Sequence, residues 1–140
     1  MSIQDKEIEI IDDFSIYEDW MEKYEYIIEL GKDLPLIADQ HKTDDNLISG
    51  CQSKVWLHAD KKDGKIIFTA DGDAIIAKGI IALMIQVLSE ETPDDILNAK
   101  LDFIKTIGLQ EHLSPTRSNG LVAMVKQMKL YALALKNKQS

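Results

Sequence analysis

The stretch of residues 74–88 constrains the fold of this 140-residue chain more than any other feature. Only Lys78 and Gln86 interrupt it, so apolar side chains cover nearly the whole circumference of the helix it predicts. The stretch is shorter than the roughly 20 residues that a membrane span needs. We therefore expect a core helix, with the rest of a single domain, residues 1–140, arranged around it.

Two short runs rich in β-forming residues, 55–59 and 66–70, precede this helix. Asp63 and Gly64 lie between them and are a turn signal, so the runs predict a β-hairpin. Residues 46–48 predict a third, shorter strand. Together these segments indicate a small three-stranded antiparallel sheet.

Helix signals lie on both sides of the sheet. Residues 3–11 predict a short amphipathic helix, and Ser15 with Glu18 predicts a capping box for a second helix, which Gly31 ends. Residues 71–73 predict the N-cap of the apolar helix, and Thr92 with Pro93 predicts the start of a short helix at 94–98. Another short helix is expected at 101–107, closed by Gly108. A long last helix is expected from Ser114 and Pro115 to about Asn137. This order predicts the α+β class, with helices packed on one face of the sheet.

The net charge of −8 is concentrated at the start of the chain. Residues 1–30 hold ten acidic residues and two lysines, whereas residues 31–140 are neutral overall. This acidity argues against nucleic-acid binding. It is typical of a solvated helix face, and the alternative is a docking surface for a basic partner.

Cys51 is the only cysteine, which excludes an intrachain disulfide and zinc sites built from several thiols. A lone thiol fits a reducing compartment, and residues 1–10 contain no apolar signal-peptide core, so we expect a cytoplasmic protein without membrane contact.

The thiol of Cys51 lies in a polar segment between strand signals, with Gly50, Gln52 and Ser53 as its neighbours. Two interpretations stay open: a reactive thiol on a loop, or a small buried apolar side chain.

His112 and Arg117 are the other candidates for chemistry. A cysteine hydrolase or peroxidatic thiol protein would need a histidine to generate the thiolate, and His112 is the best placed by sequence. Arg117, the only arginine, falls in the first turn of the last helix, where a positive charge opposes the helix dipole. It is either a surface ion pair or a charge-assisted contact to a loop or partner.

Two sequence blocks resemble the SufE family of sulfur acceptor proteins. The stretch GCQSKVW, residues 50–56, matches the family hallmark G-C-Q-S-x-V-W, and HLSPTRSNGL, residues 112–121, resembles a second block. The resemblance extends from about Phe14 to Tyr131 and leaves the acidic residues 1–13 outside it as an N-terminal extension.

The resemblance implies the small α+β fold shared with cluster scaffolds of the IscU type. It also implies a carrier and activator rather than an enzyme. Cys51 would take persulfide sulfur from a cysteine desulfurase (SufS- or CsdA-like) and pass it toward a cluster scaffold (SufBCD-like). Gly50, Gln52, Ser53, Arg117 and His112 would support the loop or the partner contact.

On this interpretation the chain needs no metal and no cofactor, because the pyridoxal phosphate belongs to the desulfurase. We further expect Cys51 to be partly shielded in the free protein, with its side chain turned toward apolar neighbours, since burial would keep the thiol inert until docking moves the loop. The sequence leaves the oligomeric state open, with a homodimer among the states considered, and an inert interaction domain remains a third alternative.

Overall fold

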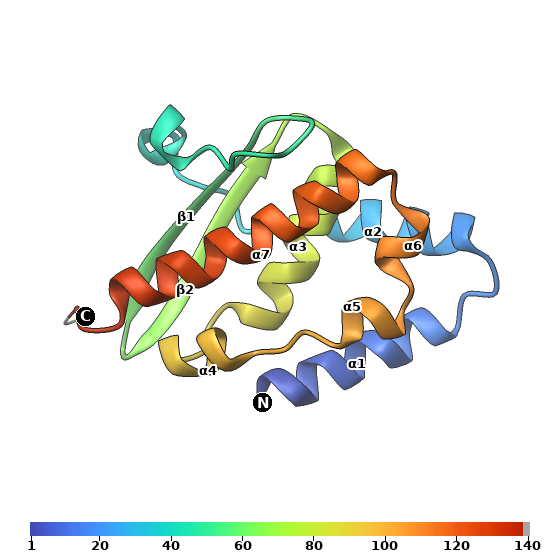
Figure 1. The fold of residues 1–140 in the computed structure, drawn as a ribbon, viewed down its shortest axis with the longest axis horizontal. Coiled ribbons are helices and arrows are strands. Elements are labelled where there is room, and N and C mark those ends of the chain that lie inside the picture. The colour runs from blue at the N-terminus through green and yellow to red at the C-terminus, as the bar shows by residue number, and fades with distance from the viewer. Residues whose placement is uncertain (139–140) are drawn as a thin grey trace.

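The apolar stretch forms α3 (Ile75–Leu88) at the centre of the fold in the computed structural model, which describes residues 1–138. Contacts reach α3 from α2, from the second strand and from α1 and α7 (Figure 1). Its buried residues are Ile76, Ala77, Gly79, Ile80, Ile81, Ala82, Leu83, Met84, Ile85, Val87 and Leu88. The expected core helix is confirmed, and among residues 1–138 no helix combines the length and apolar character that crossing a membrane requires.

The predicted hairpin is also confirmed, as β1 (Val55–Lys62) and β2 (Lys65–Gly72). The strands are antiparallel, with Val55 opposite Gly72 and Lys62 opposite Lys65. Asp63 and Gly64 both have positive φ, 53° and 80°, which is the backbone of a type I′ turn. One face of the hairpin is buried against the helices through Val55, Leu57, Ala59, Ile66, Phe68 and Ala70.

The expected third strand is wrong, because the sheet of the described chain has two strands. Asp44–Asn46 forms a 3₁₀ turn, η2, and only Leu47 then makes a single bridge to Trp56. The chain leaves the sheet edge directly afterwards, since Gly50 turns away with φ of 92°. Too few extended residues remain for a strand, although the α+β class holds.

The second face of the hairpin is covered by the segment that contains η1 (Asp39–His41) and η2. The His41 ring stacks on the His58 ring with centroids 3.8 Å apart. Lys42 Nζ lies 4.7 Å from the centroid of the Trp56 ring and 2.9 Å from Asp71 Oδ2. These contacts fix the chain that leads to Cys51.

The first N-terminal helix begins at the predicted residue 3 but extends beyond residue 11, and the second begins later than expected. α1 (Ile3–Ser15) starts at a capping box of Ser2 and Asp5, and α2 (Trp20–Lys32) starts at Asp19, whose side chain accepts from the Glu22 backbone. The predicted cap at Ser15 is wrong because α1 continues through the buried Phe14, which places Ser15 in the last turn.

Gly31 does not end α2 but lies inside it, against Gly79 of α3. A Cβ on Gly31 would lie 2.8 Å from the backbone nitrogen of Gly79. A Cβ on Gly79 would overlap the carbonyl of Ile27, 2.7 Å from its carbon. The two glycines therefore allow the backbones of α2 and α3 to touch.

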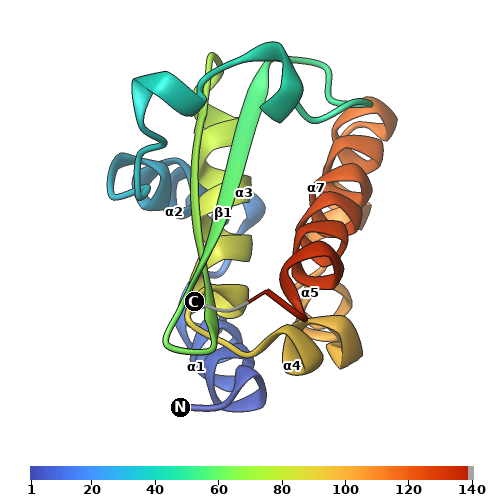
Figure 2. The ribbon, with the colours of Figure 1, turned by 90° about the vertical axis from the view of Figure 1, so that its left-hand side faces the viewer.

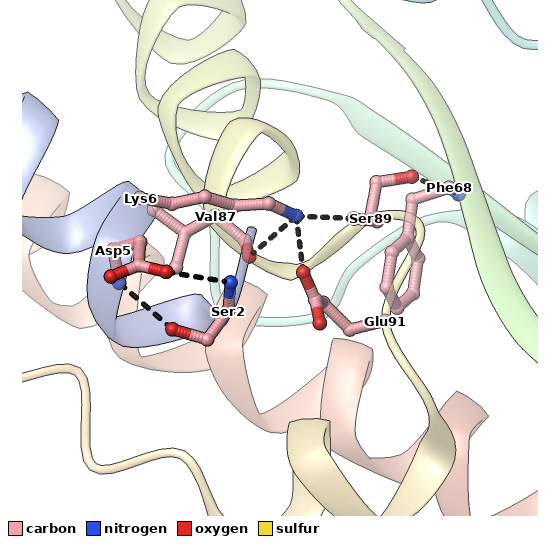
Figure 3. A network of polar contacts seen from close by, with 7 residues as sticks. All are labelled: Ser2, Asp5, Lys6, Phe68, Val87, Ser89 and Glu91. Atoms are coloured by element: carbon pink, nitrogen blue, oxygen red, sulfur yellow. Dashed lines mark hydrogen bonds and ion pairs between the residues drawn. The ribbon is translucent and has the colours of Figure 1, made fainter.

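Lys6 attaches α1 to the end of α3 (Figure 3). Its ammonium lies 2.6 Å from Glu91 Oε2 and donates to the carbonyls of Ser89 at 2.9 Å and Val87 at 3.5 Å. Glu91 is only 8% exposed. The acidic start of the chain is thus packed on the core, with Ile3, Ile10 and Phe14 of α1 buried.

Four helices complete the described part of the chain: α4 (Pro93–Asn98), α5 (Phe103–Thr106), α6 (Leu109–His112) and α7 (Pro115–Leu135). Thr92 and Ser114 cap α4 and α7 through their side chains, as predicted. The helix expected at 101–107 is confined to α5, and Gly108 begins α6 in the left-handed conformation. Figure 2 shows α7 and α2 on opposite sides of α3 and the hairpin.

Candidate functional site

Cys51 lies on the loop of residues 49–54, which joins η2 to β1. Both ends of this loop are held by hydrogen bonds. Ile48 N donates to Val55 O at 2.9 Å, Lys54 N donates to Asp73 Oδ1 at 3.0 Å, and Asp73 N donates to Lys54 O at 3.1 Å. The sequence predicted residues 71–73 as a cap for α3, which is wrong: β2 runs to Gly72, and Asp73 secures the Cys51 loop instead.

Gly50 directs the loop toward α7. Its φ of 92° lies in the region that side-chain-bearing residues rarely adopt. A Cβ at this position would lie 3.5 Å from the Cβ of Ala123, an ordinary contact, so the backbone angle rather than space requires glycine. Figures 1 and 2 both show the loop reaching from the hairpin to the start of α7.

The Cys51 thiol is half-buried and points at α7. Sγ donates to the carbonyl oxygen of Gly120 at 3.8 Å. Beside it is a cavity of about 10 Å³, near the lower limit for one water-sized atom. The lining residues come from the loop, α3 and α7: Cys51, Gln52, Ser53, Ala77, Ile80, Arg117, Gly120 and Met124.

Burial raises the pKa of the Cys51 thiol above its ordinary value. Among residues 1–138, Gly120 O is the one hydrogen-bond partner of Sγ, and a carbonyl oxygen does not stabilise a thiolate. The thiol is therefore held protonated in this arrangement. The expected partial shielding of Cys51 is confirmed.

Arg117 lines the same cavity from the first turn of α7. Its backbone N–H donates to Ser114 Oγ at 3.2 Å as part of the helix cap. Within the described chain its guanidinium has no hydrogen bond or ion pair. The only arginine of the protein thus lines the cavity beside the thiol, and its guanidinium donors are uncommitted within the described chain.

His112 lies outside this cavity. Its ring stacks on Trp20 with centroids 4.2 Å apart, and Nδ1 donates to the Gly108 carbonyl at 2.9 Å. The described structure contains no contact between His112 and Cys51. The cysteine–histidine pair of the hydrolase interpretation is therefore not favoured.

Asp73 and Gly120 were not assigned to the site by sequence reasoning. Gly120 carries a recognisable signal, because glycine inside a helix costs about 1 kcal/mol and indicates a close approach. Asp73 carries no such signal, since its partner Lys54 is 19 residues away in the chain.

The described residues 1–138 contain no metal-binding cluster. No group of three or more histidine, cysteine and acidic side chains among them could hold an ion.

Three comparisons relate this chain to known proteins. The family model SufE, described as an Fe-S metabolism associated domain, matches residues 8–132. An uncharacterised SufE-like protein of Rhizobium meliloti (strain 1021) is 40% identical over 126 residues, covering 86% of this chain and 90% of that protein. The solution structure of a hypothetical protein from Thermus thermophilus has a similar fold, with a TM-score of 0.77 at 21% identity over 92% of this chain and 94% of that one.

Proposed function

The chain belongs to the SufE family, whose role lies in Fe-S metabolism, and we propose that within it Cys51 accepts persulfide sulfur from a pyridoxal-phosphate-dependent cysteine desulfurase. The protein would then be a sulfur carrier and an activator of the desulfurase. The observation that carries the proposal is the half-buried Cys51 thiol beside a cavity for about one atom.

The transfer needs one nucleophile in this chain. Deprotonated Cys51 attacks the outer sulfur of the desulfurase persulfide, a new S–S bond forms at Cys51 Sγ, and the S–S bond of the donor breaks. The electron pair of the broken bond stays on the desulfurase cysteine, which leaves as a thiolate. Atoms and electrons balance without an oxidant, a metal or a cofactor in the acceptor.

The enclosed position of Cys51 suits a carrier. The sulfane sulfur of a persulfide is open to attack by any free thiol, so a carrier has to keep it from solvent. The cavity beside Sγ is of the size of the single added atom. Because burial raises the pKa of the Cys51 thiol, the free protein would react slowly, and docking that moves the loop would expose and activate it.

Arg117 supports this step by its charge and position. A cation beside the thiol stabilises the thiolate once the loop moves, and a planar guanidinium can also bind a carboxylate or carbonyl of the partner. Gly50 supplies the turn of the loop, and Gln52 and Ser53 line the cavity. His112 would affect only the neighbouring surface.

The sulfur would leave by the same chemistry in reverse, toward a thiol of a downstream cluster scaffold. The pyridoxal phosphate belongs to the desulfurase in this scheme. We also retain a cytoplasmic location as part of the proposal, because a persulfide carrier works in a reducing compartment.

Mass spectrometry tests the transfer. The protein is incubated with a cysteine desulfurase from the same source and L-cysteine, and a persulfide adds about 32 Da to the peptide that contains Cys51. Desulfurase turnover is measured in parallel. We expect both the adduct and the stimulation to disappear in Cys51→Ser.

A matched variant separates the thiol from its position. Ser53→Cys combined with Cys51→Ser moves the thiol two residues along the same loop. We expect this variant to gain far less adduct than wild type. An equal yield from the relocated thiol, or full stimulation by Cys51→Ser, would contradict the proposed role.

A further inference from the structure

A groove between α5 and α7 lies apart from the Cys51 cavity and shares no lining residue with it. Its volume is about 410 Å³, within the range of small-molecule sites. We propose that this groove binds a small amphipathic anion, an apolar body that carries a carboxylate or a similar oxyanion headgroup. The proposal does not depend on the role of Cys51.

The wall of the groove is apolar. Leu101 and Leu121 are buried at its base, and Ile104 and Val125 are half-buried beside them. Val122 is 54% exposed and adds an apolar side chain that is open to solvent. The surface can therefore remove the apolar part of a ligand from water.

The rim of the groove is cationic, with Lys100, Lys105, Lys126 and Lys129. Lys129 Nζ donates to the Ala99 carbonyl at 2.6 Å. The ammonium groups of the other three have no hydrogen bond or ion pair within the described chain. This is notable because the protein carries 24 acidic residues and a net charge of −8.

Asp102 is the only acidic residue that lines the groove. It also lines the neighbouring hollow beside Glu7. Burial, and secondly the Asp102 charge, raises the pKa of Glu7. The rim thus has more positive than negative charge, which selects an anionic headgroup over a cationic one.

The groove is preformed by a constrained turn. Leu101 has φ of 58°, an uncommon conformation for a residue with a branched side chain, yet it is only 6% exposed. Burial of its side chain offsets the strain, and the Lys129–Ala99 hydrogen bond ties the turn to α7. A site that exists before the ligand arrives loses less affinity to ordering.

Decanoate is a suitable probe, because it joins one carboxylate to one flexible apolar chain. It is titrated below its micelle concentration into the full-length protein, and amide chemical shifts are followed by NMR. We expect saturable changes at residues 100–105 and 121–129. 1-Decanol, with the same chain and no charge, should bind at least about 5-fold more weakly.

Two variants test the charge and the apolar wall separately. Lys100→Gln with Lys126→Gln should weaken decanoate binding about 5-fold, whereas Lys62→Gln with Lys65→Gln, the same charge change on the hairpin, should leave it unaltered. Val122→Asp should abolish binding without unfolding, since the side chain is exposed. Circular dichroism checks the fold of each variant.

Three results would overturn the assignment. They are the absence of saturable shifts, equal affinity for decanol and decanoate, and equal weakening by the hairpin lysine pair. Binding to phosphatidylglycerol vesicles without binding of monomeric decanoate would also overturn it, because the surface would then recognise a membrane rather than a single ligand.

Discussion

The Sγ atom of Cys51 lies 3.8 Å from the carbonyl oxygen of Gly120, although the two residues are 69 positions apart. A Cβ on Gly120 would lie 3.6 Å from the same sulfur and 3.6 Å from the Cys51 Cα. The missing side chain therefore leaves the space beside the thiol. Glycine is an unfavourable residue inside a helix, so the stability of α7 does not explain it. We therefore assign Gly120 to the Cys51 site.

The first prediction concerns this space. Gly120→Ala should stabilise the protein by about 0.5–1 kcal/mol, because alanine is the better helix residue and the new Cβ meets Cys51 at an ordinary distance. The same methyl group would reduce the cavity, so the yield of Cys51 persulfide should fall. Urea unfolding and mass spectrometry measure the two effects.

Gly79→Ala is the contrasting control. Its Cβ would overlap the Ile27 carbonyl, so we expect destabilisation by about 2 kcal/mol or more. A Gly120→Ala variant that accepts sulfur fully would show that the space beside Cys51 has no role in the transfer. A variant less stable than wild type would contradict the expected contact between the new Cβ and Cys51.

The second prediction concerns the pH dependence of the thiol. Because burial raises the pKa of Cys51, alkylation by iodoacetamide should be slower in the folded protein than in urea, and its rate should rise at higher pH. Folding keeps the proton on the thiol. The associated stability is thus present below the unfolded pKa and is lost as the pH rises through the folded pKa.

Cys51→Ser should remove this alkaline loss of stability, which urea unfolding across the pH range can detect. Equal alkylation rates in the folded and the unfolded protein would contradict the buried position of the thiol.

The third prediction concerns Arg117. Its guanidinium has no partner in the described chain, so Arg117→Ala should change the stability by less than about 0.5 kcal/mol. It should nevertheless weaken stimulation of the desulfurase, because Arg117 lines the cavity beside Cys51. Turnover assays and thermal unfolding compare the two effects.

Arg117→Lys is the matched control for charge. It should restore part of the stimulation if the positive charge acts on the thiolate, and none if the planar guanidinium binds the partner. A large fall in Tm of Arg117→Ala with full stimulation would reassign the residue to structure.

The fourth prediction concerns the attachment of α1. Glu91→Gln should destabilise the protein by about 3 kcal/mol, because it leaves the enclosed Lys6 ammonium without its counter-charge. Urea unfolding gives the value. Lys32→Met, which breaks the exposed pair with Glu29, should cost less than about 0.5 kcal/mol.

The two pairs are matched in charge and differ in burial. If both substitutions cost the same, the Lys6–Glu91 pair would contribute no more than a surface ion pair.

Local patterns were predictable wherever neighbours in the chain decide the structure. Asp63 and Gly64 adopt the positive φ values that their turn signal predicts, and Thr92 and Ser114 cap their helices as expected. The same kind of pattern failed at Ser15, because the burial of Phe14 extends α1 past a capping motif that would otherwise be adequate. The prediction that Gly31 ends α2 was wrong for a similar reason. Glycine is needed there because the backbone of α2 contacts Gly79 of α3.

By itself the sequence determined that this protein has one thiol, that the thiol follows a glycine in a loop before a hairpin, and that an apolar helix forms the core. It also carried the two blocks that resemble its family. Only the tertiary structure decided that Gly120 and Arg117 face Cys51, that His112 pairs with Trp20 instead, and that lysines of α7 gather at a groove. The reason is that burial, pKa and cavity shape depend on contacts between segments far apart in the chain. A local sequence pattern does not predict which of these segments come together.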